Sequence, residues 1–127
     1  MKAESPVIGV VDDELDLLDL VATILQEEGY TVMCMESPAQ AQQLEQAESR
    51  PELLVLDIML PGMTGIELAR KLRADGFPNT PMIAISASSS MLRRARDSGL
   101  FQDALSKPFD LDTFLGVVEQ QLDHAAS

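Results

Sequence analysis

Five side chains whose chemistry could combine in one site follow short apolar stretches of the chain. They are Asp12, Asp13, Asp57, Ser86 and Lys107. Each apolar stretch predicts a strand buried in a parallel sheet. The carboxyl ends of parallel strands share one edge, which is where open α/β sheets bind ligands. The sequence therefore predicts a polar site at that edge, with Asp57 held at its mouth.

Three neighbouring carboxylates repel one another unless a positive charge offsets them. Mg²⁺ prefers oxygen ligands and is typically bound by few carboxylates together with water and phosphate oxygens. Lys107 adds a mobile point charge suited to a phosphoryl oxygen, and the Ser86 hydroxyl can donate to the same group. The five residues predict a cation-assisted phosphoryl site in which one carboxylate is the nucleophile.

Strand and helix patterns alternate along the chain, which predicts repeated βα units and a mainly parallel sheet. We expect strands at 6–11, 30–35, 53–57, 82–85 and 104–107. We expect helices at 13–28, 65–74 and 88–98, one beginning at Pro38 and one after Asp110. The helix after Pro38 offers only Leu44 and small alanines for burial, so its packing should be marginal.

The composition fits one globular domain and excludes several partners. A chain of 127 residues, 46% of them apolar, suits a single hydrophobic core. Its formal charge of -12 disfavours direct contact with nucleic acid or anionic membranes, and no apolar run is long enough to span a bilayer. One cysteine, Cys34, cannot form an internal disulfide, so we expect a cytoplasmic location and a buried, inert thiol.

Four segments carry a resemblance to the receiver domain of two-component response regulators, and it covers essentially the whole chain. They are VVDDE at 10–14, LDIMLPGMTG at 56–65, ISA at 85–87 and KPF at 107–109. The resemblance implies a flavodoxin-like, doubly wound (βα)₅ fold in three layers, with a parallel sheet of order 2-1-3-4-5. We expect one receiver domain over 1–127, with its core at about 6–123.

The resemblance also implies a role for each site residue. Asp57 resembles the phosphoacceptor, Lys107 the phosphoryl-binding lysine and Ser86 the hydroxyl that moves towards the phosphoryl group. Mg²⁺ would be held by Asp12, Asp13, Asp57 and the backbone carbonyl of Met59. The donor would be a histidine kinase, a histidine phosphotransfer protein or a small acyl phosphate. Such a domain is a regulatory switch, not an enzyme, and assists only its own phosphorylation and dephosphorylation.

The chain departs from the family pattern at Ala104, three residues before Lys107, where an aromatic residue is usual. Either Phe101 or another neighbour fills the space, or the signal leaves by another route through the fourth helix. Family members signal through the fourth helix, fifth strand and fifth helix, to a partner or as a homodimer. The basic cluster Arg93, Arg94 and Arg96 could belong to that surface, or form a solvated helix face with an Arg93–Asp97 pair.

Three other functions fit parts of the pattern. Aspartyl-nucleophile phosphatases of the haloacid dehalogenase kind carry a second Asp two residues after the first, where this chain has Met59. An FMN-binding flavodoxin needs a loop rich in Ser, Thr and Gly where this chain has acidic residues 12–14. The third is a receiver-like interaction module that works without phosphorylation, and only a phosphorylation experiment can exclude it. The sequence does not distinguish a stand-alone regulator from a phosphorelay intermediate or a fragment, and does not name the kinase.

Met59 lies two residues beyond Asp57, a position that flanks the route of attacking water in the family. Its side chain either shields the acyl phosphate and slows hydrolysis, or packs beside Met63. We predict that Met59→Asn changes the dephosphorylation rate, measured as the decay of the phosphorylated protein. An unchanged lifetime would remove the shielding role.

Overall fold

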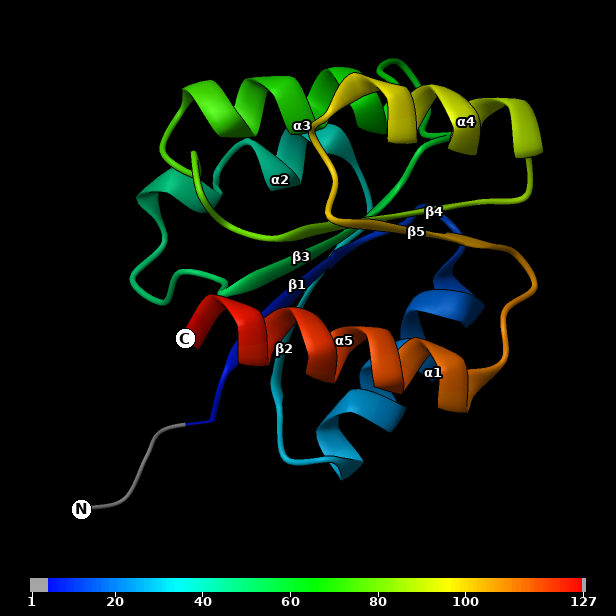
Figure 1. Ribbon diagram of the computed structural model, residues 1–127. Helices are drawn as coiled ribbons and strands as arrows, with labels where there is room; N and C mark the ends of the chain where they lie inside the picture. The colour runs from blue at the N-terminus through cyan, green and yellow to red at the C-terminus, as the bar shows by residue number, and fades with distance from the viewer. Residues whose placement is uncertain (1–4, 127) are drawn as a thin grey trace.

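The structure, a computed structural model, describes residues 5–126 of the chain, with side chains described as far as Asp123. This part forms one five-stranded sheet in the order β2-β1-β3-β4-β5, and every neighbouring pair is parallel (Figure 1). The strands are β1 (Val7–Val11), β2 (Thr31–Met35), β3 (Leu53–Asp57), β4 (Met82–Ser86) and β5 (Asp103–Ser106). The predicted fold class and strand order are confirmed.

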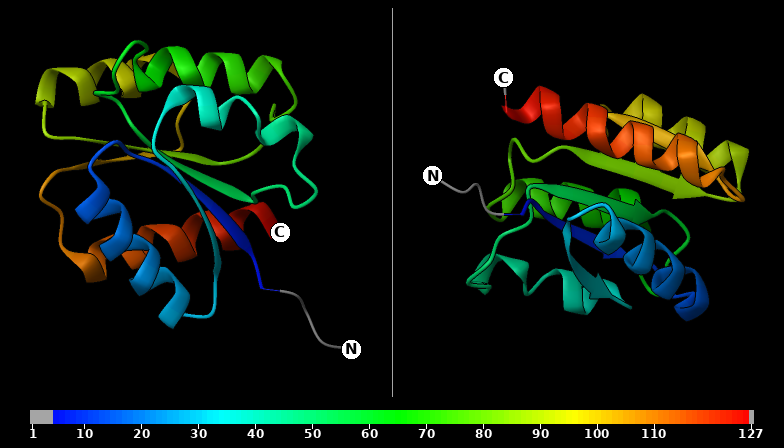
Figure 2. Two further views of the ribbon diagram at one scale, coloured as in Figure 1. Left: turned by 180° about the vertical axis from the view of Figure 1, so that it is seen from behind. Right: turned by 90° about the horizontal axis from the view of Figure 1, so that it is seen from below.

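Helices cover both faces of the sheet and complete three layers. They are α1 (Leu15–Glu27), α2 (Pro38–Ala41), a 3₁₀ turn at Leu44–Gln46, α3 (Gly65–Ala74), α4 (Ser89–Ser98) and α5 (Leu111–Ala126). Helices α1 and α5 lie on one face, and α2, α3 and α4 lie on the other (Figures 1 and 2). In the described part of the chain, no helix has the length and apolar character needed to cross a membrane.

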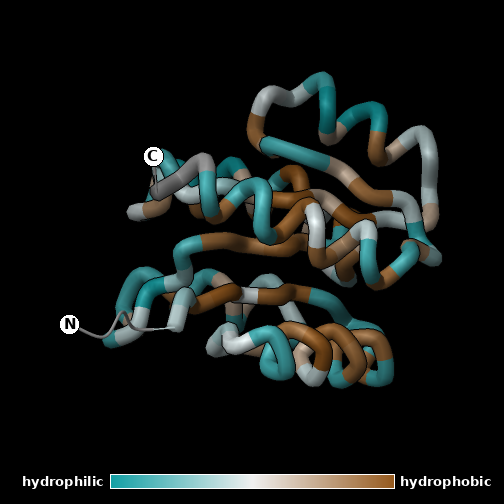
Figure 3. Tube along the Cα trace, turned by 60° about the horizontal axis from the view of Figure 1, so that its bottom comes forward, coloured by the Kyte–Doolittle hydropathy of each residue, from teal (hydrophilic) through white to brown (hydrophobic). Residues whose placement is uncertain are grey.

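The central strand β3 is buried along its whole length, because helices pack against both of its faces. Leu54 and Leu56 join the cluster under α2 and α3, whereas Leu53 and Val55 join the cluster under α1 and α5. This double burial explains the unbroken apolar run in the sequence. Figure 3 shows the same pattern, with hydrophobic strands at the centre and mixed helices around them. Asp57 ends this strand and is therefore held at the end of a fully buried element.

Two helices differ from the sequence prediction at their starts or lengths. Helix α1 begins at Leu15 instead of residue 13, because the Glu14 N–H donates to Asp12 Oδ1 at 2.9 Å and the acidic turn stays outside the helix. The expected helix after Ser37 is only four residues long and is followed by the 3₁₀ turn. The expectation of marginal packing there is consistent with this shortness.

The prediction of a buried Cys34 is wrong, because this side chain is exposed. Its strand, β2, is the edge of the sheet and has a neighbour on one side only. Partial burial, together with the charge of Asp19, still raises the pKa of the Cys34 thiol. The thiol is therefore weakly nucleophilic at neutral pH despite its exposure.

The start of α3 is pressed directly against the end of β3, beside Asp57. Thr64 and Glu67 form a capping box, and the Gly65 N–H donates to the Ile58 carbonyl at 2.9 Å. A Cβ on Gly65 would collide with the Asp57 carbonyl oxygen and would lie 2.8 Å from Ile58 Cα. Gly65 is needed here because only a residue without a side chain permits this backbone approach.

We predict that Gly65→Ala destabilises the protein by about 1–3 kcal/mol, the usual range for overpacking, and displaces the backbone around Asp57. Gly116→Ala in α5 is the matched control, since a Cβ there meets nothing within 4 Å. The control should be neutral or stabilising by up to about 1 kcal/mol, because alanine favours a helix over glycine. Urea unfolding measures both variants, and equal effects would contradict the close approach at Gly65.

Candidate phosphoryl and metal site

The sheet register brings the predicted residues to one edge. Val11 pairs with Leu56, so Asp12 and Asp57 follow on neighbouring strands, and both are almost fully buried, at 1% and 3% exposure. Ser86 ends β4, and its carbonyl accepts a hydrogen bond from the N–H of Lys107, which directly follows β5. Side chains separated by up to 95 residues therefore meet at the carboxyl end of the sheet.

The amino group of Lys107 is at the centre of this site. Its Nζ lies 2.9 Å from Asp12 Oδ2, 3.1 Å from Asp57 Oδ2 and 2.7 Å from Glu14 Oε1. The Glu14 contact was not predicted, because three consecutive acidic residues give no sign of which side chain reaches the lysine. The one feature of the sequence that points to this contact is the position of Glu14 directly after the two aspartates at the end of the strand.

The electrostatics of the site favour a reactive carboxylate. Burial raises the pKa of Asp57 to about 6, and the charge of Asp12 adds to that effect. The Met59 N–H, which donates to Asp57 Oδ1 at 3.0 Å, and Lys107 act in the opposite direction. Burial alone would lower the pKa of Lys107, but the three carboxylates outweigh it and hold the amine protonated. At neutral pH, Asp57 is thus mostly ionised yet more basic than an exposed aspartate.

The acidic residues fit a hard divalent cation. One carboxylate oxygen from each of Asp12, Asp13 and Asp57 lies within 4.8 Å of the others. The buried Asp12 Oδ2 accepts no hydrogen bond in the described structure, and its one close polar contact there is the ion pair with Lys107 at 2.9 Å. Three clustered carboxylate oxygens, one of them without a hydrogen bond, are a donor set that suits Mg²⁺.

Ser86 is fully buried and does not hydrogen-bond to Asp57 in the described structure. Its Oγ instead accepts from the N–H of Ser88 at 3.0 Å. Ala104 is 6% exposed and belongs to the cluster under α4, against which Phe101 packs. This packing supports the interpretation that Phe101 fills the space beside Ala104.

The residues that the sequence analysis singled out around the site, Met59 and the basic cluster, are exposed. Met59 is 55% exposed and lies outside the buried core. Arg93, Arg94 and Arg96 are exposed on α4, and the described residues contain no Arg93–Asp97 ion pair. His124 lies beyond the described side chains.

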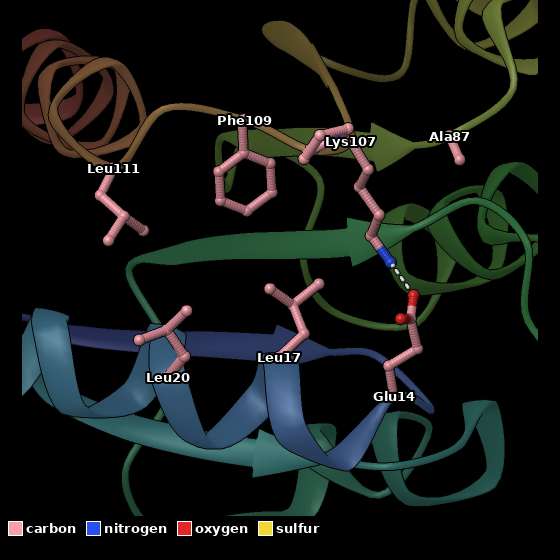
Figure 4. Close-up of a pocket in the computed structure, with 8 residues that line it drawn as sticks. Glu14, Leu17, Leu20, Ala87, Lys107, Phe109 and Leu111 are labelled. Carbon is pink, nitrogen blue, oxygen red and sulfur yellow. Dashed lines mark hydrogen bonds and ion pairs between the residues drawn. The ribbon is translucent and has the colours of Figure 1, made fainter.

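A groove of about 490 Å³ opens beside the site. Lys107 and Glu14 face each other at one end, and Leu17 and Leu20 of α1 lie opposite Phe109 and Leu111 (Figure 4). The groove is therefore charged next to Asp57 and apolar further away.

The parallel sheet and the acidic strand-end cluster with its lysine define a receiver-type α/β domain. The chain belongs to the response regulator receiver domain family of two-component systems, whose pattern matches residues 8–119.

The chain spans about half the length of the curated relatives it matches. The uncharacterized transcriptional regulatory protein YbdJ of Bacillus subtilis is 30% identical over 115 residues, which are 91% of this chain and 50% of YbdJ. The DNA-binding response regulator MtrA of Mycobacterium tuberculosis is 35% identical over 100 residues, 79% of this chain and 43% of MtrA.

Solved structures of receiver domains and response regulators have a similar fold over nearly the whole length of this chain. A CheY-like receiver domain protein from Methanospirillum hungatei superposes with a TM-score of 0.86 at 25% identity, covering 97% of this chain and 98% of that one. Response regulator TrrA from Thermotoga maritima, in complex with Mg²⁺ and BeF, gives 0.81 at 29% identity, with 91% and 98% covered.

The raised pKa of Asp57 predicts a pH-dependent cost in stability. A carboxyl group with a folded pKa near 6 and an ordinary value of 3.8 stabilises the fold below about pH 4 and loses that contribution as pH rises through 6. Asp57→Asn does not titrate. Without divalent cations, we predict that its advantage in unfolding free energy over the wild type grows by about 2–3 kcal/mol across that window. Asp16→Asn, at an exposed position, is the control, and an advantage for Asp57→Asn that is flat with pH would contradict the prediction.

Proposed function

We propose that Asp57 accepts a phosphoryl group from the phosphohistidine of a histidine kinase or histidine phosphotransfer protein. The observation that carries the proposal is the contact of Lys107 Nζ with Asp57 Oδ2 at 3.1 Å, beside the three clustered carboxylates. Asp57 is buried and its pKa is raised, and among the described residues Lys107 is the one cation in contact with it. Family membership supports the same assignment.

In the proposed reaction, a carboxylate oxygen of Asp57 attacks phosphorus while the phosphorus–nitrogen bond to the imidazole breaks. The imidazole leaves with the electron pair of that bond, and Asp57 becomes an acyl phosphate. Lys107 turns from the Asp57 carboxylate to a phosphoryl oxygen, which keeps its charge paired. The Met59 N–H holds the other carboxylate oxygen in place. Alignment and electrostatics carry such a step.

Mg²⁺ is the cation we assign to Asp12, Asp13, Asp57 and the backbone carbonyl of Met59. When bound, it would neutralise charge on the phosphoryl oxygens. The buried Asp12 Oδ2, which is ion-paired with Lys107 but accepts no hydrogen bond in the described structure, supports this assignment. The complex of TrrA with Mg²⁺ and BeF is a related precedent.

The switch would act by moving Ser86 towards the phosphoryl group and shifting the surface of α4, β5 and α5. With Ala104 and Phe101 filling the space beneath α4, we propose that the change is transmitted by α4. That surface would bind an output partner or a second copy. We propose that residues 1–127 act as one regulatory domain without an enzymatic substrate of its own, in the cytoplasm. The charge of -12 argues against nucleic acid binding by this chain itself, although relatives such as MtrA carry a DNA-binding name.

The direct test is incubation with Mg²⁺ and acetyl phosphate, followed by intact mass measurement. We expect the wild type to gain one phosphoryl group and Asp57→Asn to gain none. Asp13→Asn should slow the gain by weakening the cation site, and Asp16→Asn should leave it unchanged. If the wild type gains no mass, or if Asp57→Asn gains as much, Asp57 is not the phosphoacceptor. A protein that still binds its partner without phosphorylation would then be a phosphorylation-independent module.

A further inference from the structure

Glu14 differs from the other carboxylates around Lys107 in its position and exposure. Its Oε1 makes the shortest of the three contacts with Lys107 Nζ, at 2.7 Å. The Glu14 side chain is 62% exposed, whereas those of Asp12 and Asp57 are 1% and 4% exposed. Its own N–H donates to Asp12 Oδ1, which fixes its backbone directly before α1.

This position places a negative charge at the mouth of the site. Glu14 and Lys107 both line the groove beside the strand ends, and they reach each other across it from the turn before α1 and the loop after β5 (Figure 4). Asp12 and Asp57 hold the lysine from the buried side, so Glu14 is not needed to keep Lys107 near the nucleophile. The carboxylate of Glu14 therefore adds a charge that any incoming phosphoryl donor must approach.

We propose that Glu14 is a specificity-determining residue that disfavours doubly anionic small phosphodonors relative to phosphoramidate-type donors. The inference rests on the proposed function of Asp57. Acetyl phosphate carries two negative charges at neutral pH, whereas phosphoramidate carries a protonated nitrogen and a net charge of one. A phosphohistidine imidazole has the same phosphorus–nitrogen bond. An exposed negative charge at the entrance slows the more anionic donor more strongly, and salt screens the difference.

The test compares the two donors in three variants. We measure the rate constant for phosphorylation of Asp57 by acetyl phosphate and, separately, by phosphoramidate. Each measurement is made with Mg²⁺ at low and at high ionic strength. The variants are Glu14→Gln, Glu14→Asp and Asp16→Asn. Glu14→Gln removes the charge with little change in shape, and Glu14→Asp keeps the charge. Asp16→Asn removes an exposed charge in the first turn of α1, outside the contacts of Lys107.

We expect Glu14→Gln to raise the acetyl phosphate rate relative to the phosphoramidate rate by about threefold or more at low salt, a fraction of the roughly 10- to 1,000-fold that a whole charged cleft can produce. This shift should shrink at high salt, and Glu14→Asp and Asp16→Asn should keep a ratio close to that of the wild type. A purely structural role for Glu14 would change both rates equally.

Two outcomes would overturn the inference. An unchanged donor ratio in Glu14→Gln, with Asp57 phosphorylated in the wild type, removes the role of Glu14 and leaves the proposed function intact. A wild type that neither donor phosphorylates at Asp57 removes the proposed function and this inference together. If Glu14→Gln unfolds, as circular dichroism would show, the donor ratio of Glu14→Asp decides, because loss of the wild-type ratio in that charge-retaining variant also overturns the inference.

Discussion

The contact between the Lys107 amine and its carboxylate neighbours is the constraint on which the rest of the site depends. Asp12 and Asp57 are almost fully buried, and two buried carboxylates beside each other are unstable without a cation. Lys107 supplies one positive charge, which is fewer than the negative charges around it. The site is therefore held together while keeping an excess of negative charge, and that excess is the property that suits it to a divalent cation.

The parallel sheet is what makes this arrangement possible. Four strand ends, from β1, β3, β4 and β5, deliver their side chains to one edge, and the register fixes their relative depth. Helix α3 closes in behind Asp57 because Gly65 permits contact with the end of β3. Arg73, near the other end of α3, donates to the carbonyls of Thr80 and Leu100 and so ties α3 to the loops before β4 and β5. The packing of α3 against the sheet and the position of the strand-end side chains therefore depend on each other.

The features that could be predicted from the sequence are those that follow from hydrophobic periodicity and from the direction of the strands. Unbroken apolar runs indicate buried strands, and the positions of Asp57 and Lys107 at the ends of two such runs predict that both lie at one edge of the sheet. Properties that depend on neighbours in the tertiary structure could not be predicted from the sequence. Cys34 is exposed because β2 is the edge strand, and apolar neighbours in sequence do not show which strand lies at the edge. The contact of Glu14 with Lys107 depends on the direction of a side chain in a turn, for which hydrophobic periodicity carries no signal.

The most direct measurement is a crystal structure of the protein treated with Mg²⁺ and beryllofluoride, which mimics a bound phosphoryl group. We expect beryllium bonded to a carboxylate oxygen of Asp57 and a cation coordinated by Asp12, Asp13 and the Met59 carbonyl. We also expect the Lys107 amine to leave the Asp57 oxygen for a fluorine. A structure in which Asp57 is unmodified and Lys107 still contacts it, under conditions that saturate a related receiver domain, would show that Asp57 is not the phosphoacceptor.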